Sequence, residues 1–208
     1  MPGRYRRFSA ALMLAALLLA MPAHARQPEP APIVVFGDSL AAGTAQGMSH
    51  LGALVVGQGI AGWRLFRRDV PVRLQQLADA SATAAGVVIF LGANDLDGLL
   101  PRGLADYTRR LDDLRRAVPT GVPVVWVAQP RHRQPERAQA AGALNGLLRE
   151  VADRHGDQFV VPAAGQEMEP PMRAADGLHF TMRGYAAIAQ DVLRQGFDGH
   201  IGTVAKRP

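Results

Sequence analysis

The chain has 208 residues, a formal net charge of +5 at pH 7 and no cysteine. Without cysteine it can form neither a disulfide framework nor a thiolate site. Three of its arginines fall within the first seven residues, and the other basic residues are scattered among acids instead of forming a stripe interleaved with aromatics, which argues against nucleic-acid binding.

The first 25 residues have the pattern of a secretory signal peptide. Arginines at positions 4, 6 and 7 precede the apolar run 10–20, and Ala23-His24-Ala25 places small residues where signal peptidase reads them. The residues after the paired arginines match a twin-arginine signal poorly, so a Sec-type signal is favoured. We expect cleavage after Ala25 and a periplasmic or secreted protein. Later segments stay well short of the ~20 apolar residues of a membrane helix, so we expect no membrane span after cleavage.

The remaining chain predicts one α/β domain. A proline-rich lead-in (26–32) precedes the domain (33–200), and a short tail (201–208) follows it. Apolar, β-branched runs without polar alternation predict strands covered on both faces, at 33–36, 53–56, 86–91, 122–128 and 158–161. Between these strands, over 104–118 and 141–151, and after the last of them, over 185–192, apolar residues recur three and four apart, as in helices. This alternation predicts a doubly wound, flavodoxin-like three-layer α/β/α sandwich with a mainly parallel five-stranded sheet and its site at the C-terminal ends of the strands.

Four short motifs stand at or after these predicted strand ends. They are Gly37-Asp38-Ser39-Leu40, the glycine-rich stretch 57–62, Gly92-Ala93-Asn94-Asp95 and Asp176-Gly177-Leu178-His179. In this order they resemble the four blocks of the SGNH hydrolases, also called the GDSL esterase/lipase family, over essentially the whole mature domain. The third block departs slightly from the usual family pattern by carrying Ala93.

The residue chemistry leads to the same interpretation. A serine hydroxyl is a weak nucleophile that needs a base within hydrogen-bond reach and a third group to orient that base. Ser39 stands between the first strand and an expected helix start, so we interpret it as the nucleophile; the alternative is that it only caps the helix. Asp176-x-x-His179 lets the aspartate accept from Nδ1 while Nε2 faces Ser39, so His179 is the expected general base; the alternative is a structural loop histidine. His50 and His132 could also approach the pocket, but neither has an aspartate at a comparable spacing.

The resemblance also implies an oxyanion hole. In the family its donors are the serine backbone N–H, a glycine N–H after the second strand and an asparagine amide after the third, which Ser39, Gly62 and Asn94 match. Gly59 could replace Gly62. Asp38, Asp95 and Gly59 are the expected supporting residues. We expect Asp95 to fix the Asn94 loop through nearby backbone, although it could be an ordinary loop acid.

The stretch 57–62 also fits the dinucleotide pattern G-x-G-x-x-G. That interpretation is disfavoured, because a loop containing Trp63 and running into Pro71 follows in place of a helix. The ribose-binding acid should also end the next strand about 20 residues on, whereas Asp79 comes earlier, before that predicted strand begins. An exported protein also has little access to NAD. We therefore expect no cofactor, and the lack of an H-E-x-x-H motif or a Cys/His cluster predicts no metal site.

The expected substrate is a small acyl ester, with acetyl groups on polysaccharides as the leading class. A lysophospholipase or thioesterase would be favoured by an apolar channel near Trp63, Phe66 and Met48. The sequence also fits an O-acetyltransferase, or a glycan-binding module that has lost turnover. Trp63 could wall the acyl site or stack on a sugar, although core packing is the commoner use of such a residue. The arginines at 64–68 and 131–133 could meet an anionic glycan or form a solvated face.

Overall fold

The computed structural model describes residues 30–197, with the side chains of 100–102 left out. The predicted signal peptide, most of the lead-in and the tail lie outside these residues. The five strands are β1 (Ile33–Gly37), β2 (Val55–Gly59), β3 (Gly86–Phe90), β4 (Val124–Val127) and β5 (Gln158–Val160). They form one parallel sheet in the order β2-β1-β3-β4-β5.

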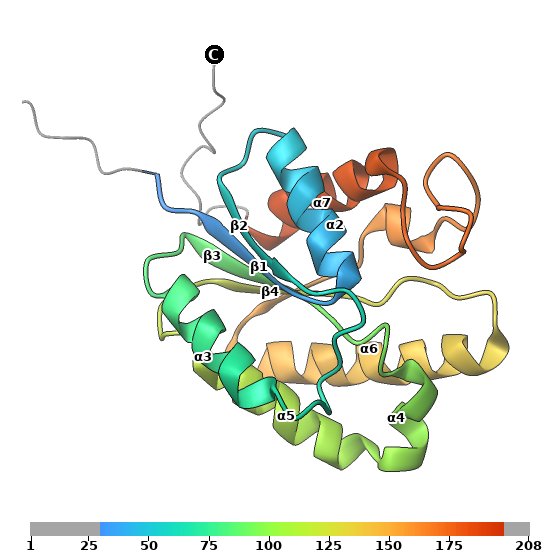
Figure 1. The fold of residues 1–208 in the computed structure, drawn as a ribbon, viewed down its shortest axis with the longest axis horizontal. Coiled ribbons are helices and arrows are strands. Elements are labelled where there is room, and N and C mark those ends of the chain that lie inside the picture. Colours follow the sequence, from blue (N-terminus) through green and yellow to red (C-terminus); the bar gives the residue numbers. More distant parts are fainter. Residues whose placement is uncertain (1–29, 198–208) are drawn as a thin grey trace, which may run out of the picture.

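Helices cover both faces of this sheet (Figure 1). On one side lie α2 (Ser39–His50) and α7 (Met182–Gly196). On the other lie α3 (Val70–Ser81), α4 (Leu96–Arg102), α5 (Leu104–Ala117) and α6 (Pro135–His155). A short 3-10 helix, η1 (Ala163–Gln166), follows β5. The predicted α/β/α sandwich is confirmed, and its sheet is parallel throughout. Within residues 30–197, the helices are too short or too polar to cross a membrane.

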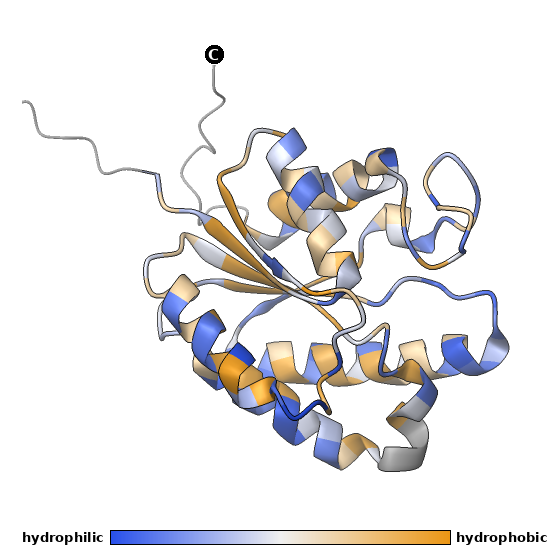
Figure 2. Ribbon diagram, viewed as in Figure 1, coloured by the Kyte–Doolittle hydropathy of each residue, from blue (hydrophilic) through white to orange (hydrophobic). Residues whose placement is uncertain are grey.

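The central strands are buried on both faces, which explains their unbroken apolar runs. Side chains alternate between the two faces along a strand. In β1, Val34 and Phe36 enter the core under α3, α5 and α6, whereas Ile33 and Val35 enter the core under α2 and α7. Figure 2 shows these strands as an apolar band between the two helix layers.

The second strand departs from its prediction. β2 covers 55–59 instead of 53–56, so Gly57 and Gly59 belong to the strand and do not follow it. Pairing with β1, which places Gly59 beside Gly37, outweighs the low strand propensity of glycine. As an edge strand it is not covered on both faces: Val56 is 39% exposed, and Leu54, just before it, 47%.

The dinucleotide interpretation fails on the same segment. After β2 the chain runs as a loop over 60–69, which we call the β2 loop, and α3 begins only at Val70 with Pro71 in its first turn. A pyrophosphate site would need a helix N-terminus directly at the glycines. The glycines here serve the sheet edge and the loop instead.

Candidate active site

Ser39 and His179 are brought together from opposite ends of the described chain. Ser39 is the first residue of α2, directly after β1, and His179 lies in the segment between β5 and α7. His179 Nε2 is 2.8 Å from Ser39 Oγ, and its Nδ1 is 2.5 Å from Asp176 Oδ2. The three side chains therefore form one continuous chain of hydrogen bonds, with the imidazole in the middle.

Asp176 is held in its ionised form by its own loop. Its Oδ1 accepts from the backbone N–H groups of Leu178 at 3.0 Å and His179 at 2.9 Å. The hydrogen bond from the His179 ring, helped by these N–H groups, lowers the pKa of Asp176 to about 2 against the opposing effect of desolvation. At neutral pH the carboxylate can therefore hold the imidazole with its proton on Nδ1 and leave Nε2 as an acceptor for the serine proton.

Asp38, and not Ser39, caps the helix. The Asp38 side chain accepts from Leu40 N at 2.9 Å, so Ser39 stands inside the first turn with its hydroxyl turned toward His179. The other Asp38 oxygen accepts from Gly92 N at 3.0 Å and Ala93 N at 3.1 Å, in the loop after β3. Asp38 thus ties the serine turn to the loop that carries Asn94.

The charge of Asp38 is buried at this junction. Burial raises its pKa to about 6, although the three N–H donors act in the opposite direction. Because 6 lies below neutral pH, the carboxylate is ionised at pH 7 and can accept from all three. The sequence indicates that Asp38 could cap the helix, because an aspartate often stands directly before one. It does not indicate the bonds of Asp38 to Gly92 and Ala93, which lie more than 50 residues away.

The two candidate oxyanion glycines have different surroundings. At Gly59 a Cβ atom would lie 2.3 Å from Ala42 N, so this position must be glycine for β2 to pass the first turn of α2. Ile60 N donates to Gly37 O at 3.1 Å, and because N–H directions alternate along a strand, the Gly59 N–H points away from β1. Gly62 has φ +72° and an open surrounding. Gly62 therefore remains the expected donor.

The third-strand loop is fastened to the β2 loop. Asn94 Nδ2 donates to Trp63 O at 3.2 Å. Asp95 is buried, and its Oδ2 accepts from Leu65 N and from Tyr107 Oη, each at 3.1 Å. One backbone group that Asp95 binds is distant in sequence: Leu65 N lies 30 residues away, in the β2 loop.

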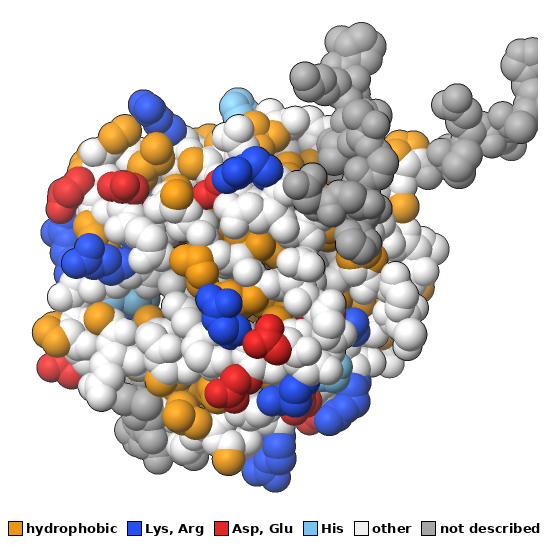
Figure 3. All heavy atoms as spheres, turned by 180° about the vertical axis from the view of Figure 1, so that it is seen from behind, with side chains coloured by type: hydrophobic (Ala, Val, Ile, Leu, Met, Phe, Trp, Pro, Cys, Tyr) orange, Lys and Arg blue, Asp and Glu red, His pale blue; other side chains and the backbone are white. Residues whose placement is uncertain are grey.

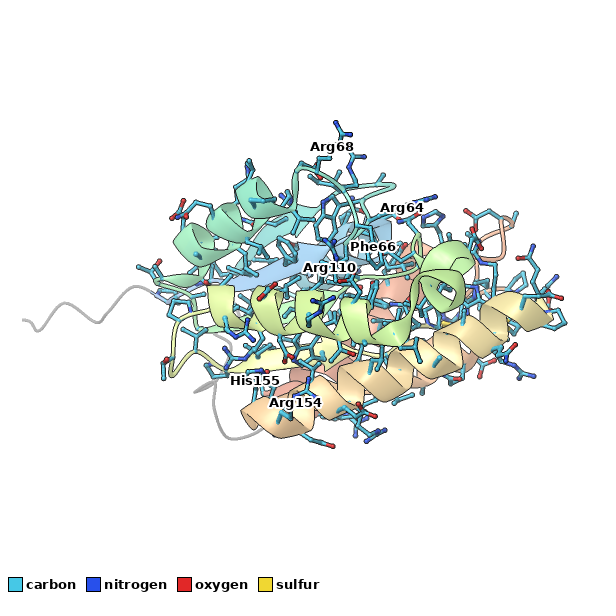
Figure 4. All side chains as sticks on the ribbon, turned by 90° about the horizontal axis from the view of Figure 1, so that it is seen from below. Arg64, Phe66, Arg68, Arg110, Arg154 and His155 are labelled. Atoms are coloured by element: carbon cyan, nitrogen blue, oxygen red, sulfur yellow. The ribbon has the colours of Figure 1, made fainter. Side chains whose placement is uncertain are left out.

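Arg110 of α5 supports the β2 loop from below. Its Nη1 donates to Leu65 O at 3.2 Å, and its guanidinium carbon lies 4.6 Å from the centre of the Phe66 ring. Figure 4 shows Arg110 of α5 next to Phe66 of the β2 loop; Arg64 and Arg68 of the same loop lie on either side of Phe66 in the sequence. Phe66 is thus occupied by packing against α5.

Trp63 belongs to the core. It is 1% exposed and packs edge-on against Phe36, with ring centres 5.4 Å apart. Core packing is therefore confirmed for Trp63, and stacking on a sugar is excluded by its burial. Met48 is equally buried, but in the cluster under α2 and α7 on the other face of the sheet. Trp63, Met48 and Phe66 consequently do not line a common apolar channel.

A cavity of about 400 Å³ opens beside Asp176. Its lining is polar and of mixed charge: His132, Arg133, Gln134, Arg137, Ala175, Asp176, Gly177 and Leu178. Both arginines are paired, Arg133 with Glu169 at 2.6 Å and Arg137 with Asp97 at 3.0 Å. On the face seen in Figure 3, acidic and basic side chains are likewise interspersed. The cavity therefore suits a polar, uncharged group better than a polyanion.

His132, on the wall of this cavity, gives a pH-dependent prediction. Burial, together with the charges of Arg137 and Arg173, lowers its pKa from 6.5 to about 4. Between these values the unfolded chain binds a proton that the folded protein does not, so this histidine makes stability fall as the pH drops. We expect the melting temperature of the protein to fall relative to that of His132→Gln when the pH is lowered from 7 to 5, as followed by circular dichroism. A difference between the two proteins that is the same at both pH values would contradict this burial.

Among residues 30–197, His, Cys, Asp and Glu side chains do not come together in groups of three or more that could hold a metal ion. The groups that the site brings together are a serine hydroxyl, an imidazole, a carboxylate and an amide. These are the parts that acyl transfer requires: a nucleophile, a base and hydrogen-bond donors.

Several solved structures share this fold. A carbohydrate acetylesterase from Sinorhizobium meliloti, Est24, is 17% identical with a TM-score of 0.59, and the match covers 78% of this chain and 96% of that one. A catalytic mutant of Axe2, an acetylxylan esterase from Geobacillus stearothermophilus, is 18% identical with a TM-score of 0.61, over 83% and 97% of the two chains. A lipase/acylhydrolase from Enterococcus faecalis is 24% identical with a TM-score of 0.57, over 78% and 95%. At these identities the likeness is one of fold.

Family membership rests on the sequence itself. A search of curated proteins finds no significant match. The model of the GDSL-like lipase/acylhydrolase family, in contrast, matches residues 35–187, from β1 into α7, and so spans all four motifs. This chain therefore belongs to the GDSL-like lipase/acylhydrolase family, the SGNH hydrolases, which are ester hydrolases.

Proposed function

We propose that this protein is an exported serine esterase that hydrolyses small acyl esters, with acetyl groups on polysaccharides as its leading substrates. The observation that carries the proposal is the unbroken contact from Asp176 through His179 to Ser39. Such a chain makes a serine hydroxyl nucleophilic at neutral pH.

The geometry supports the following reaction. His179 Nε2 takes the proton of Ser39 as Oγ attacks the acyl carbon, and the carbonyl oxygen becomes an oxyanion. The backbone N–H groups of Ser39 and Gly62 and the side-chain amide of Asn94 are the proposed donors to that oxyanion. The imidazolium then gives its proton to the leaving alkoxide, and the alcohol departs. Water, deprotonated by the same imidazole, releases the acid from the acyl-serine and restores the hydroxyl.

The packing around the site supports a short acyl group. Trp63 and Met48, two residues that would have to line a long channel, are buried in separate clusters on opposite faces of the sheet. The cavity beside Asp176 offers polar side chains such as His132 and Gln134, which suit the hydroxyl groups of a sugar alcohol. That two solved structures of the same fold are named as carbohydrate acetylesterase and acetylxylan esterase adds weight to this substrate class.

Export is the part of the proposal that rests on sequence alone. The arginines at positions 4, 6 and 7, the apolar run 10–20 and Ala23-His24-Ala25 form the proposed Sec-type signal. A polysaccharide esterase would meet its substrate outside the cytoplasm, so the two parts of the proposal agree.

A series of p-nitrophenyl esters from acetate to palmitate tests the substrate size. We expect kcat/KM to be highest for acetate and at least about 100-fold lower for palmitate, because Trp63, Phe66 and Met48 are taken up by packing and do not offer a channel in which extra methylenes would gain binding energy. Release of acetate from acetylated xylooligosaccharides should follow, and Ser39→Ala is the control.

A preference for long chains would identify a lipase-like enzyme. Acetate transfer to sugar acceptors without hydrolysis would identify a transferase, and no turnover of any ester would leave a glycan-binding module.

A further inference from the structure

The segment that carries Asp176 and His179 has little regular structure of its own. Residues 161–181, the triad loop, connect β5 to α7 and contain only η1 and a single bridge between Arg173 and Phe180. In Figure 1 this loop is the orange-to-red segment that extends beyond the helices. The Asp176 and His179 side chains are 52% and 36% exposed, so burial alone does not hold them in place. Long loops of this kind need specific anchors to keep one conformation.

Arg173 is the anchor. It is 2% exposed, and its guanidinium lies over the Phe180 ring, 4.1 Å from the ring centre. Its nitrogens donate to four backbone carbonyls: Glu167 O at 3.1 Å, Leu178 O at 3.0 Å, Gly165 O at 3.1 Å and Arg131 O at 3.3 Å, with Met168 Sδ a further contact at 4.0 Å. A buried cation whose three guanidinium nitrogens all donate to the main chain acts on the course of the backbone.

One of these carbonyls belongs to the peptide next to the base. The Leu178–His179 peptide accepts from Arg173 Nη1 through its carbonyl at 3.0 Å and donates to Asp176 Oδ1 through its N–H at 2.9 Å. This peptide is therefore held at its carbonyl by Arg173 and at its N–H by Asp176. Because the His179 Cα follows directly, the direction of the imidazole depends on this peptide.

The other carbonyls tie the two ends of the triad loop together and to the loop after β4. Gly165 lies in η1, near the start of the triad loop, whereas Arg131 lies outside it, in the loop after β4. Arg131 N also donates to Gly165 O at 3.0 Å, so these two loops meet at the guanidinium. Through Arg173, the part of the triad loop that carries His179 is thus tied to η1 and to the loop after β4.

We infer that Arg173 is a positioning residue, which keeps His179 in line with Ser39 by fixing the Leu178–His179 peptide to η1 and to the loop after β4. The inference rests on the proposed function for its catalytic consequence, whereas its structural part is independent of any substrate. A planar fork with several N–H donors is needed, because a single ammonium cannot reach carbonyls spread around the side chain.

The test compares Arg173→Met and Arg173→Lys with Arg115→Met. Arg115 is the matched control. It is also largely buried, with Nε donating to both Asp157 oxygens at 2.7 and 2.9 Å and Nη1 to Val118 O at 3.3 Å, but it lies at the end of α5, beside the residue that precedes β5. With p-nitrophenyl acetate, we expect Arg173→Met to lower kcat about 100-fold with KM changed by less than about threefold, since a misplaced base of about 1 Å has that effect. Arg173→Lys should lower kcat about 10-fold, as it keeps the charge but not the fork. Arg115→Met should lose stability and keep the kcat.

A second measurement needs no substrate. The proton held between His179 Nδ1 and Asp176 Oδ2, 2.5 Å apart, should give a far-downfield proton NMR signal in the wild-type protein and in Arg115→Met. We expect this signal to shift upfield or broaden in both Arg173 variants. If Arg173→Met does not fold, Arg173→Lys decides alone. A wild-type signal and wild-type kcat in the Arg173 variants, or a loss of kcat in Arg115→Met as large as theirs, would overturn the inference. If the wild type hydrolyses no ester while the NMR result is as expected, the proposed function fails and the positioning role stands.

Discussion

Substitution of Ser39 by alanine is expected to lower ester hydrolysis by about 10⁴-fold or more, because without the hydroxyl no acyl-enzyme forms and only the binding and oxyanion groups remain. The thermal stability should stay close to that of the wild type. The reason is that Asp38, and not Ser39, caps α2, and within residues 30–197 the hydroxyl bonds only to the His179 ring. Initial rates on p-nitrophenyl acetate and a melting curve measure the two quantities.

The activity and the thermal stability of Ser39→Ala together distinguish a catalytic serine from a structural one. If Ser39→Ala retained more than about a tenth of the activity, the nucleophile would be another residue, since loss of a catalytic serine leaves far less. If it were inactive but also strongly destabilised, the serine would be part of the folding core. Ser39→Thr serves as a further comparison, because it keeps a hydroxyl but adds a methyl group beside His179.

Asp38→Ala is expected to have the second largest effect, on stability and activity together. It leaves the N–H groups of Leu40, Gly92 and Ala93 without their acceptor in the protein interior. Loss of the cap and of two further buried hydrogen bonds should cost about 4 kcal/mol of unfolding free energy, measured by urea denaturation. The kcat should fall about 100-fold, because the turn of Ser39 and the loop of Asn94 lose their common support.

Asp157→Ala is the matched control for this substitution. Asp157 is also a buried carboxylate, and it accepts from Arg115 and from Trp126 Nε1 at 3.0 Å, away from the strand ends that carry the site. It should lower stability to a similar extent while leaving kcat unchanged at a temperature where both variants are folded. If the two variants lost activity in parallel, stability alone would explain the effect of Asp38.

The strand ends and their motifs were predictable because each depends on local sequence. Apolar runs mark β1 and β3, buried on both faces, and short polar motifs follow directly after them. Local sequence therefore places Ser39 at this edge of the sheet, whereas Asp176 and His179, 16 and 19 residues after the end of β5, were assigned to the same site through their spacing and the family resemblance. The three residues do meet there, within 2.8 Å of their neighbours in the chain of hydrogen bonds.

Other features could not be predicted, because they depend on contacts between distant segments. The extension of β2 through Gly57 and Gly59 follows from pairing with β1, and no local propensity indicates it. Asp95 accepts from an N–H in the β2 loop and from Tyr107 of α5, both distant in sequence. Arg173 resembles any other arginine of a polar loop in the sequence, and only the fold shows that its side chain is buried among carbonyls.

The burial of Trp63 could likewise not be predicted from the local sequence. Next to a glycine-rich stretch, an aromatic residue can belong to a ligand pocket or to the core, and local sequence does not distinguish the two. In the folded protein Trp63 packs against Phe36 of β1 and therefore belongs to the core. The polar cavity, in contrast, is built by the segment 132–137 and the triad loop, which lie far apart in sequence. Its mixed charge comes from Asp176 in the lining and from the ion pairs that Arg133 and Arg137 form.

The central claim is that Ser39 forms a covalent acyl-enzyme with the help of His179. Intact-mass spectrometry after acid quenching of the protein with p-nitrophenyl acetate, followed by peptide mapping, tests it most directly. We expect one acetyl adduct on the peptide that contains Ser39 in the wild type, and none on that peptide in Ser39→Ala or His179→Ala. An adduct on another residue, or hydrolysis that proceeds unchanged in Ser39→Ala, would contradict the account.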